Sequence, residues 1–336
     1  MKNLIFVILI AISLGYSSQN KQNNYLTYHP IMGKAKLAYM QEDYNKCIYF
    51  CHDAFKIAYP FFNLYRNDYY LLAKSYYRNN DKPNFQKYFQ LALRNGLNPI
   101  LLTKDSVFFK EEYEFYYKQC KIEFRTFCDR TDKKLVKNIQ DGIRKDQKYR
   151  AQLYFGVTDS VWLAPFDTIS DEAYLTYSFR VMNEAPKASQ KTLDSLRKLQ
   201  ASLDKANFIF FNNYIKKNGY PSFHLVGNNE GLLYTILLHF SPEYKKTLGT
   251  LWLKEVISGK ISPYRLAQLV DDAYMDLGEE PVYGIPKEKF SSSSGKIEKI
   301  VYNETKVNGL RVRIGLYSLS IEKQILELKQ KHEFIE

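Results

Sequence analysis

His239 is the residue of this chain best suited to acid–base chemistry, because an imidazole titrates near neutral pH. It ends the apolar run Leu232–Phe240 just before Ser241 and Pro242, so we expect it at the end of a helix. There it could serve as a general base or as a ligand. A histidine in that position can also satisfy the last carbonyls of its helix without any chemistry, and this structural role is favoured.

Asp271 and Asp272 are the carboxylates that could serve a metal ion or His239. Neighbouring residues of a helix point about 100° apart, so at most one of the two can face a given pocket. A hydrolase hypothesis follows, in which His239 is the base, Asp271 orients it, and Arg150 or Arg311 holds an anionic group. The sequence has no phosphate-binding glycine loop, nucleophile elbow or HExxH helix. We expect no metal and no cofactor.

The four cysteines form two pairs with helical spacing. Cys47 and Cys51 are one turn apart, and Cys120 and Cys128 are two turns apart, which corresponds to roughly 6 and 12 Å along a helix. A disulfide requires α-carbons about 5.5–6 Å apart. Two parallel bridges between straight helices would not match, so we expect at most one disulfide unless a helix ends before Cys128. Zinc is less favoured, because neither spacing is a recognised ligand spacing.

The first residues have the order of a secretory signal. Met1–Asn3 supply a positive start, an apolar run extends from Leu4 to Leu14, and small residues follow up to Ser18. An apolar run of this length is too short for a membrane span, which needs about 20 residues. We therefore predict a signal peptide at 1–18 and an exported, periplasmic or extracellular mature protein with no membrane span. In that oxidising environment a disulfide is the leading hypothesis for the cysteines.

Composition and charge indicate a globular protein. The chain has 336 residues, of which 45% are hydrophobic and 25% charged, enough for two domains. Its net charge is +12, but residues 20–128 hold 16 basic and 10 acidic side chains and residues 129–336 hold 31 and 26. Nucleic-acid-binding proteins usually concentrate positive charge in one stripe. The even distribution predicts a solvated surface and no nucleic-acid partner.

The front part repeats itself with an offset of 38 residues. Tyr39 aligns with Tyr77, Asp43 with Asp81, and Ala54 with Ala92. Apolar spacing predicts four helices, at Ala35–Tyr39, Tyr44–Tyr59, Tyr69–Arg78 and Phe85–Arg94. The breaks between them are predicted at Gln41–Asp43 and Asn79–Asp81.

These residues resemble tetratricopeptide repeats over roughly 30–96, and helices reaching residue 128 would complete the stack. The resemblance implies a surface for a protein or peptide partner. A helical scaffold without a partner groove explains the pattern equally well.

The charged stretch Asp129–Lys137 is the expected boundary to a second part. A helix is predicted at Leu135–Tyr154, and Lys296–Tyr302 and Val307–Ile314 alternate like two short strands. A long helix after Pro186 carries one apolar stripe, formed by Leu193, Leu196, Leu199, Leu203 and Ala206.

Residues 138–318 contain an ordered series of landmarks that resembles a bacterial domain family of unknown function. The matching residues are Asp146, Gln147, Arg150, Gly219, Pro221, Val226, Gly227, His239, Asp271, Tyr283, Gly284, Arg311, Gly315 and Leu316. The chain departs from the family at four polar positions: Leu238 replaces Gln, Asp272 replaces Arg, Pro281 replaces Gln and Ile285 replaces Thr. If the family is catalytic, this chain has lost the groups that orient its histidine and aspartate.

The sequence thus predicts a mainly α fold, with a helical-repeat part at 19–128 and a mostly helical domain at 129–336 that includes a small two-stranded β element. We expect an exported, non-catalytic binding protein whose helical repeats engage a protein or peptide. The alternative is an envelope hydrolase that uses His239 and Asp271. Candidate ligand-binding residues implied by the second resemblance are Asp146, Gln147, Arg150, Tyr283 and Arg311.

Overall fold

The computed structural model describes residues 24–63, 66–103, 110–167, 171–285, 288–291, 296–300 and 302–333. The predicted signal peptide at 1–18 lies outside these residues. The described chain is mainly helical, as expected for the fold class. It contains one small two-stranded antiparallel sheet and a shorter hairpin whose two strands have two residues each. Among the described helices, none combines the length and the apolar character needed to cross a membrane.

Two helix pairs build the front part. They are formed by α2 (Tyr25–Met40) with α3 (Tyr44–Ile57) and by α4 (Asp68–Arg78) with α5 (Lys82–Arg94). The turns that close the two pairs have the same conformation, because Glu42 and Asn80 both have positive φ, at 60° and 58°. The next residues, Asp43 and Asp81, cap the following helices by accepting a bond from the backbone N–H three residues on. The predicted breaks at 41–43 and 79–81 are confirmed, with identical turns 38 residues apart.

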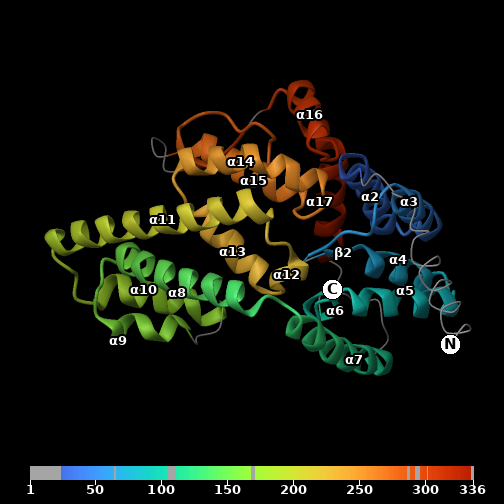
Figure 1. Cartoon of the computed structure of the whole chain (residues 1–336), viewed down its shortest axis with the longest axis horizontal. Coiled ribbons are helices and arrows are strands. Elements are labelled where there is room, and N and C mark those ends of the chain that lie inside the picture. Colours follow the sequence, from blue (N-terminus) through green and yellow to red (C-terminus); the bar gives the residue numbers. More distant parts are fainter. Residues whose placement is uncertain are drawn as a thin grey trace, which may run out of the picture.

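The remaining elements follow in chain order. They are β1 (Phe62–Asn63), β2 (Arg66–Asn67), α6 (Ile100–Thr103), α7 (Lys110–Asp129), α8 (Lys133–Phe155), α9 (Ser160–Leu163), η1 (Ala164–Asp167), α10 (Asp171–Glu184), α11 (Gln190–Asn218), α12 (Phe223–Val226), α13 (Asn229–Leu238), α14 (Pro242–Ile257), α15 (Pro263–Asp276), β3 (Glu288–Ser291), β4 (Lys296–Lys299), α16 (Glu304–Arg313) and α17 (Leu319–Glu333). The stretch Asp129–Lys137, where the part boundary is expected, contains the turn from α7 to α8 and the first residues of α8 (Figure 1).

One of the two predicted strands is wrong. Strand β4 lies within the predicted strand Lys296–Tyr302, but its antiparallel partner is β3 and not Val307–Ile314. The second segment forms helix α16. The side chain of Asn303 accepts a bond from the backbone N–H of Lys306, which caps this helix. Val307 and Arg311, four residues apart, then form its buried face.

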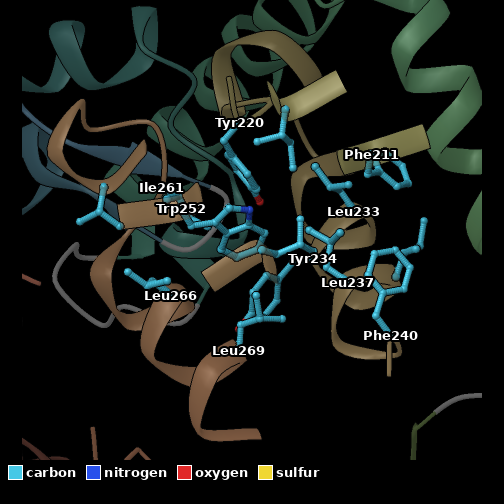
Figure 2. Close-up of a cluster of buried hydrophobic side chains, with 14 of the residues drawn as sticks. Phe211, Tyr220, Leu233, Tyr234, Leu237, Phe240, Trp252, Ile261, Leu266 and Leu269 are labelled. Atoms are coloured by element: carbon cyan, nitrogen blue, oxygen red, sulfur yellow. The ribbon is translucent and has the colours of Figure 1, made fainter. Parts of the chain in front are cut away.

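The back part has one large hydrophobic core, centred on Trp252 of α14 (Figure 2). This indole is fully buried and meets the ring of Tyr220 edge-on, with ring centroids 5.2 Å apart. Leu233 and Leu237 of α13 and Leu266 of α15 pack around it. Burying side chains of this size stabilises a fold by about 1.5–3 kcal/mol each, so this cluster holds α13, α14 and α15 together.

The disulfide prediction is wrong, because all four cysteines are free. Cys47 and Cys51 lie in the core that α2, α3 and α4 share, whereas Cys120 lies in a separate core under α5 and α7. Its thiol donates to the carbonyl of Leu97 at 3.0 Å, and burial raises its pKa to about 12. Cys128 is half-buried at the end of α7. The two pairs therefore do not face each other.

Helix α2 packs against α14, α16 and α17, so the front and back parts share a junction (Figure 1). Glycines allow this close approach. A Cβ on Gly33 of α2 would lie 2.5 Å from Cδ1 of Tyr317, and a Cβ on Gly315 would lie 2.9 Å from the backbone of Leu26. Real Cβ atoms do not come this close to other atoms, so side chains at these positions would push the two parts away from each other.

We predict that Gly33→Ala weakens this junction. The added methyl group meets the ring of Tyr317 and should lower the free energy of unfolding by about 1–3 kcal/mol. Gly309→Ala is the matched control, because Gly309 is also helical but its Cβ would have open space. This control should gain about 0.5–1 kcal/mol from helix propensity. Urea unfolding of both variants measures the difference, and equal shifts would show that α2 is not packed against Tyr317.

Candidate functional site

The candidate site is built where α8, α11 and the end of α13 meet. Asp146 and Arg150 are four residues apart on α8 and therefore share one face of this helix. Asp146 is fully buried, and its Oδ1 accepts a bond from Nε of Arg150 at 2.9 Å. The carboxylate of this pair thus points inward, while the arginine side chain stays 29% exposed.

His239 joins this pair as the C-cap residue of α13. Its Nδ1 lies 2.7 Å from Oδ2 of Asp146, and its backbone carbonyl accepts a bond from Nη2 of Arg150 at 3.1 Å. The histidine side chain is 28% exposed, compared with 1% for the aspartate. His239 therefore has both a structural role at the helix end and a ring edge that reaches the surface.

Helix α11 completes the network with two polar residues. Nε2 of Gln200 lies 2.9 Å from Oδ1 of Asp146 and 2.8 Å from Oδ1 of Asp204. Asp204 also accepts a bond from Arg150 at 3.0 Å. Three helices are thus cross-linked through polar side chains around one buried carboxylate.

The electrostatics of the network decide which ring nitrogen of His239 donates to Asp146. Burial by itself would raise the pKa of Asp146, but the hydrogen bond from His239 and the charge of Arg150 outweigh it, so the pKa is lowered. The opposite holds for Asp204, whose pKa is raised by burial despite the bonds from Gln200 and Arg150. An ionised carboxylate can only accept, so Nδ1 of His239 carries the proton toward Asp146. Nε2 is the ring nitrogen left for a ligand.

A cleft of about 740 Å³ opens beside His239. Its rim includes two exposed basic residues of α8, Arg144 and Lys148. Its wall is apolar and largely aromatic, formed by Tyr154, Phe155, Leu163, Phe166 and Tyr174. The rings of Phe155 and Phe166 stack with centroids 4.7 Å apart. The volume lies within the range of about 300–1,000 Å³ that is typical of ligand sites.

The pairing of His239 with Asp271 is not found. Asp271 is fully buried on α15, and its two oxygens accept bonds from the backbone N–H groups of Tyr283 at 2.7 Å and Ile285 at 2.9 Å. Burial raises its pKa although these bonds and Arg311 oppose the shift. Asp146 takes the position beside His239 that the sequence argument gave to Asp271.

Arg311 and Tyr283 lie with Asp271, away from the cleft. The guanidinium of Arg311 is fully buried and donates to the carbonyls of Tyr283 at 2.9 Å and Tyr317 at 2.8 Å, and to Glu322 at 2.8 Å. The backbone of Tyr283 is therefore held between Asp271 and Arg311. The predicted site residues thus divide into two groups: Asp146, Gln147, Arg150 and His239 at the cleft, and Asp271, Tyr283 and Arg311 in a buried clamp.

Within the described part of the chain, no three histidine, cysteine or acidic residues are grouped so that they could hold a metal ion. The chain matches no family model, no curated protein and no solved structure. The resemblances to tetratricopeptide repeats and to the domain family of unknown function therefore stay hypotheses.

Sequence reasoning missed Gln200 and Asp204. They lie on the inner face of α11, four and eight residues after the buried Leu196, whereas Leu199 of the predicted stripe is 51% exposed. The available signal was the i, i+4, i+8 spacing of these three residues. It was hidden because two of them are polar, and polar residues on an inner helix face are recognised only once their partner is known.

We predict that Asp146→Asn destabilises the protein by about 1.5–3 kcal/mol at neutral pH, because it removes the buried negative charge that His239, Arg150 and Gln200 bind, while Arg150 keeps Asp204 as a partner. The lowered pKa makes this stabilisation complete above the ordinary value of 3.8, and it is lost as the pH falls through the folded pKa. The wild type should therefore lose its advantage over the variant in acid. Urea unfolding at several pH values measures this.

Asp194→Asn is the control for this prediction. Asp194 lies on α11 and, like Asp146, pairs with an arginine of its own helix, Arg197 at 2.6 Å, but both side chains are more than half exposed. Its replacement should change the free energy of unfolding by less than about 1 kcal/mol. Similar effects of the two substitutions would contradict the view that Asp146 holds the three helices together.

Proposed function

We propose that this protein is a non-catalytic binding protein whose cleft beside His239 holds an acidic peptide segment. The observation that carries this proposal is the combination of a basic rim at Arg144 and Lys148 with an aromatic wall. A peptide with a carboxylate next to an aromatic or aliphatic side chain would be complementary to both surfaces. Export of the chain and a partner surface on the front helix pairs belong to the same proposal, and both rest on the sequence patterns.

The floor of the cleft supports binding over catalysis. Asp146 accepts bonds from four side chains, those of His239, Arg150, Gln200 and Gln147. Arg150 in turn uses three of its five N–H donors, on Asp146, Asp204 and the carbonyl of His239. Groups that are already satisfied hold a surface rigid and contribute little to a developing transition-state charge. Recognition then depends on the rim and the wall.

A second candidate function is hydrolysis, which the 2.7 Å contact between His239 and Asp146 favours. Asp146 fixes the tautomer, so Nε2 could take a proton from water or from a hydroxyl group. Ser160 lines the cleft and carries a hydroxyl group of this kind. In this alternative Asp146 replaces Asp271 as the orienting carboxylate.

Charge reversal on the rim tests the binding proposal. We predict that Lys148→Glu weakens binding of a fluorescein-labelled Glu-Phe-Glu-Phe-Glu peptide at least about tenfold, which corresponds to 1.4 kcal/mol. Lys145→Glu is the matched control, since Lys145 is exposed on the same helix but does not line the cleft. Fluorescence anisotropy gives both affinities. Equal loss in the two variants would indicate general charge attraction, and the cleft would not be the site.

The hydrolase alternative makes a different prediction. If His239 is a general base, His239→Gln should lower kcat/KM for a panel of p-nitrophenyl esters by about 10²–10⁴-fold. The binding proposal predicts no such difference between this variant and the wild type. The absorbance of the released nitrophenolate, followed over time at constant pH with Lys145→Glu as a reference variant, separates the two functions.

A further inference from the structure

A second cavity, of about 630 Å³, lies at the junction of the front and back parts. It is lined from the front by the β1–β2 hairpin and from the back by α13 and α15. Its polar lining includes Arg66, Arg265, Asn228, Gln268, Ser262 and Tyr264. The described residues that line it include two arginines and no carboxylate. Such a lining favours a ligand with negative charge.

Arg66 enters the cavity in a fixed orientation. Its Nε and Nη2 are bound by the two oxygens of Asp68, at 2.7 and 2.9 Å. Asp68 is 2% exposed and also accepts a bond from the hydroxyl of Tyr28 at 2.6 Å. The guanidinium is thus held on one side by a buried carboxylate, which leaves Nη1 for the cavity. An arginine that is held in this way loses little conformational entropy when it binds an anion.

Arg265 is held in the same manner from the other part of the molecule. Its Nη2 donates to Glu230 at 3.1 Å, and its guanidinium lies 4.2 Å from the centre of the Tyr234 ring. The side chain is 10% exposed, and Nη1 has no hydrogen-bond partner. Buried donors are normally satisfied. Arg265 lines the adjoining cavity, and an acceptor bound there would supply the missing partner after a small shift of this side chain, because Nη1 itself has almost no accessible surface.

The remaining lining residues point to the body of the ligand. Asn228 and Gln268 carry amides and Ser262 carries a hydroxyl, groups that exchange hydrogen bonds with the hydroxyls of a sugar. Tyr264 is 42% exposed as a residue, and its ring offers a flat apolar face. Ser262 also caps α15, so the positive end of a helix of 14 residues faces the same cavity. We propose that this junction cavity binds a sugar that carries an oxyanion, either a phosphate or a carboxylate.

The junction position gives such a ligand a structural consequence. Arg66 belongs to the front part and Arg265 to the back part, so one anion bound by both arginines would bridge the two. Binding should therefore raise the melting temperature of the whole chain. The proposal does not depend on the cleft beside His239, which shares no lining residue with this cavity.

Calorimetric titration of the full chain tests the proposal, with glucose 6-phosphate and glucuronate as probes. We expect saturable binding of at least one of them and a higher melting temperature in its presence, with much weaker binding of glucose and of inorganic phosphate. The preferred probe identifies the oxyanion. No saturable binding of either probe overturns the proposal, and inorganic phosphate binding as tightly as the sugar overturns the assignment of a sugar.

Three substitutions locate the site. Arg66→Lys and Arg265→Lys keep a positive charge beside Asp68 and Glu230 but remove the second guanidinium edge, and each should weaken binding at least about tenfold. Tyr264→Ala disturbs no buried ion pair and should weaken it about fivefold through the loss of the apolar face. Arg197→Lys, on the exposed side of α11, is the control and should bind as the wild type does. Wild-type affinity in the two lysine variants would overturn the proposal, and thermal unfolding without ligand verifies that each variant is folded.

Discussion

A carboxylate that leaves water must find hydrogen-bond donors and positive charge, and this constraint arranges the back part of the molecule. Asp146 is fully buried, so the helices that supply its donors, α8, α11 and the end of α13, have to meet around it. Asp271 imposes the same condition on the segment 283–285, with Arg311 on its far side. Hydrophobic burial around Trp252 supplies much of the stabilisation, while the buried charges determine which helix faces which.

What could be predicted from the sequence is what depends on neighbours along the chain. The turns at 41–43 and 79–81 were predictable because an aspartate caps the next helix within three residues. The partners of Asp146 could not be predicted, because His239 is 93 residues away along the chain and Gln200 is 54 residues away. Only Arg150, four residues away on the same helix, is within the reach of a local pattern. The sequence argument therefore gathered several of the right residues but joined His239 to the wrong carboxylate.

The other errors come from patterns that two structures satisfy equally well. The residues Val307–Ile314 alternate as a strand would, yet Val307 and Arg311 also fit one buried helix face, and the cap at Asn303 decides for the helix. On α11 the leucine stripe gave the inner face only in part: Leu196 is buried, but Leu199 is exposed while the adjacent Gln200 is buried. A shift of one residue turns a helix face by about 100°, and only a partner across the interface fixes the choice.

Helix α13 separates the two cavities, and its anchoring determines how they relate. The adjacent residues Leu238 and His239 line different cavities, the first at the junction and the second at the cleft. The helix is held near its start by the ion pair of Glu230 with Arg265 and at its end by the contact of His239 with Asp146. Its middle packs into the core around Trp252. A helix that is fixed at both ends and in its middle cannot shift toward one cavity without breaking the ion pair of Glu230 or the hydrogen bond of His239. The two cavities are therefore preorganised by the same contacts, and each is shaped before any ligand arrives.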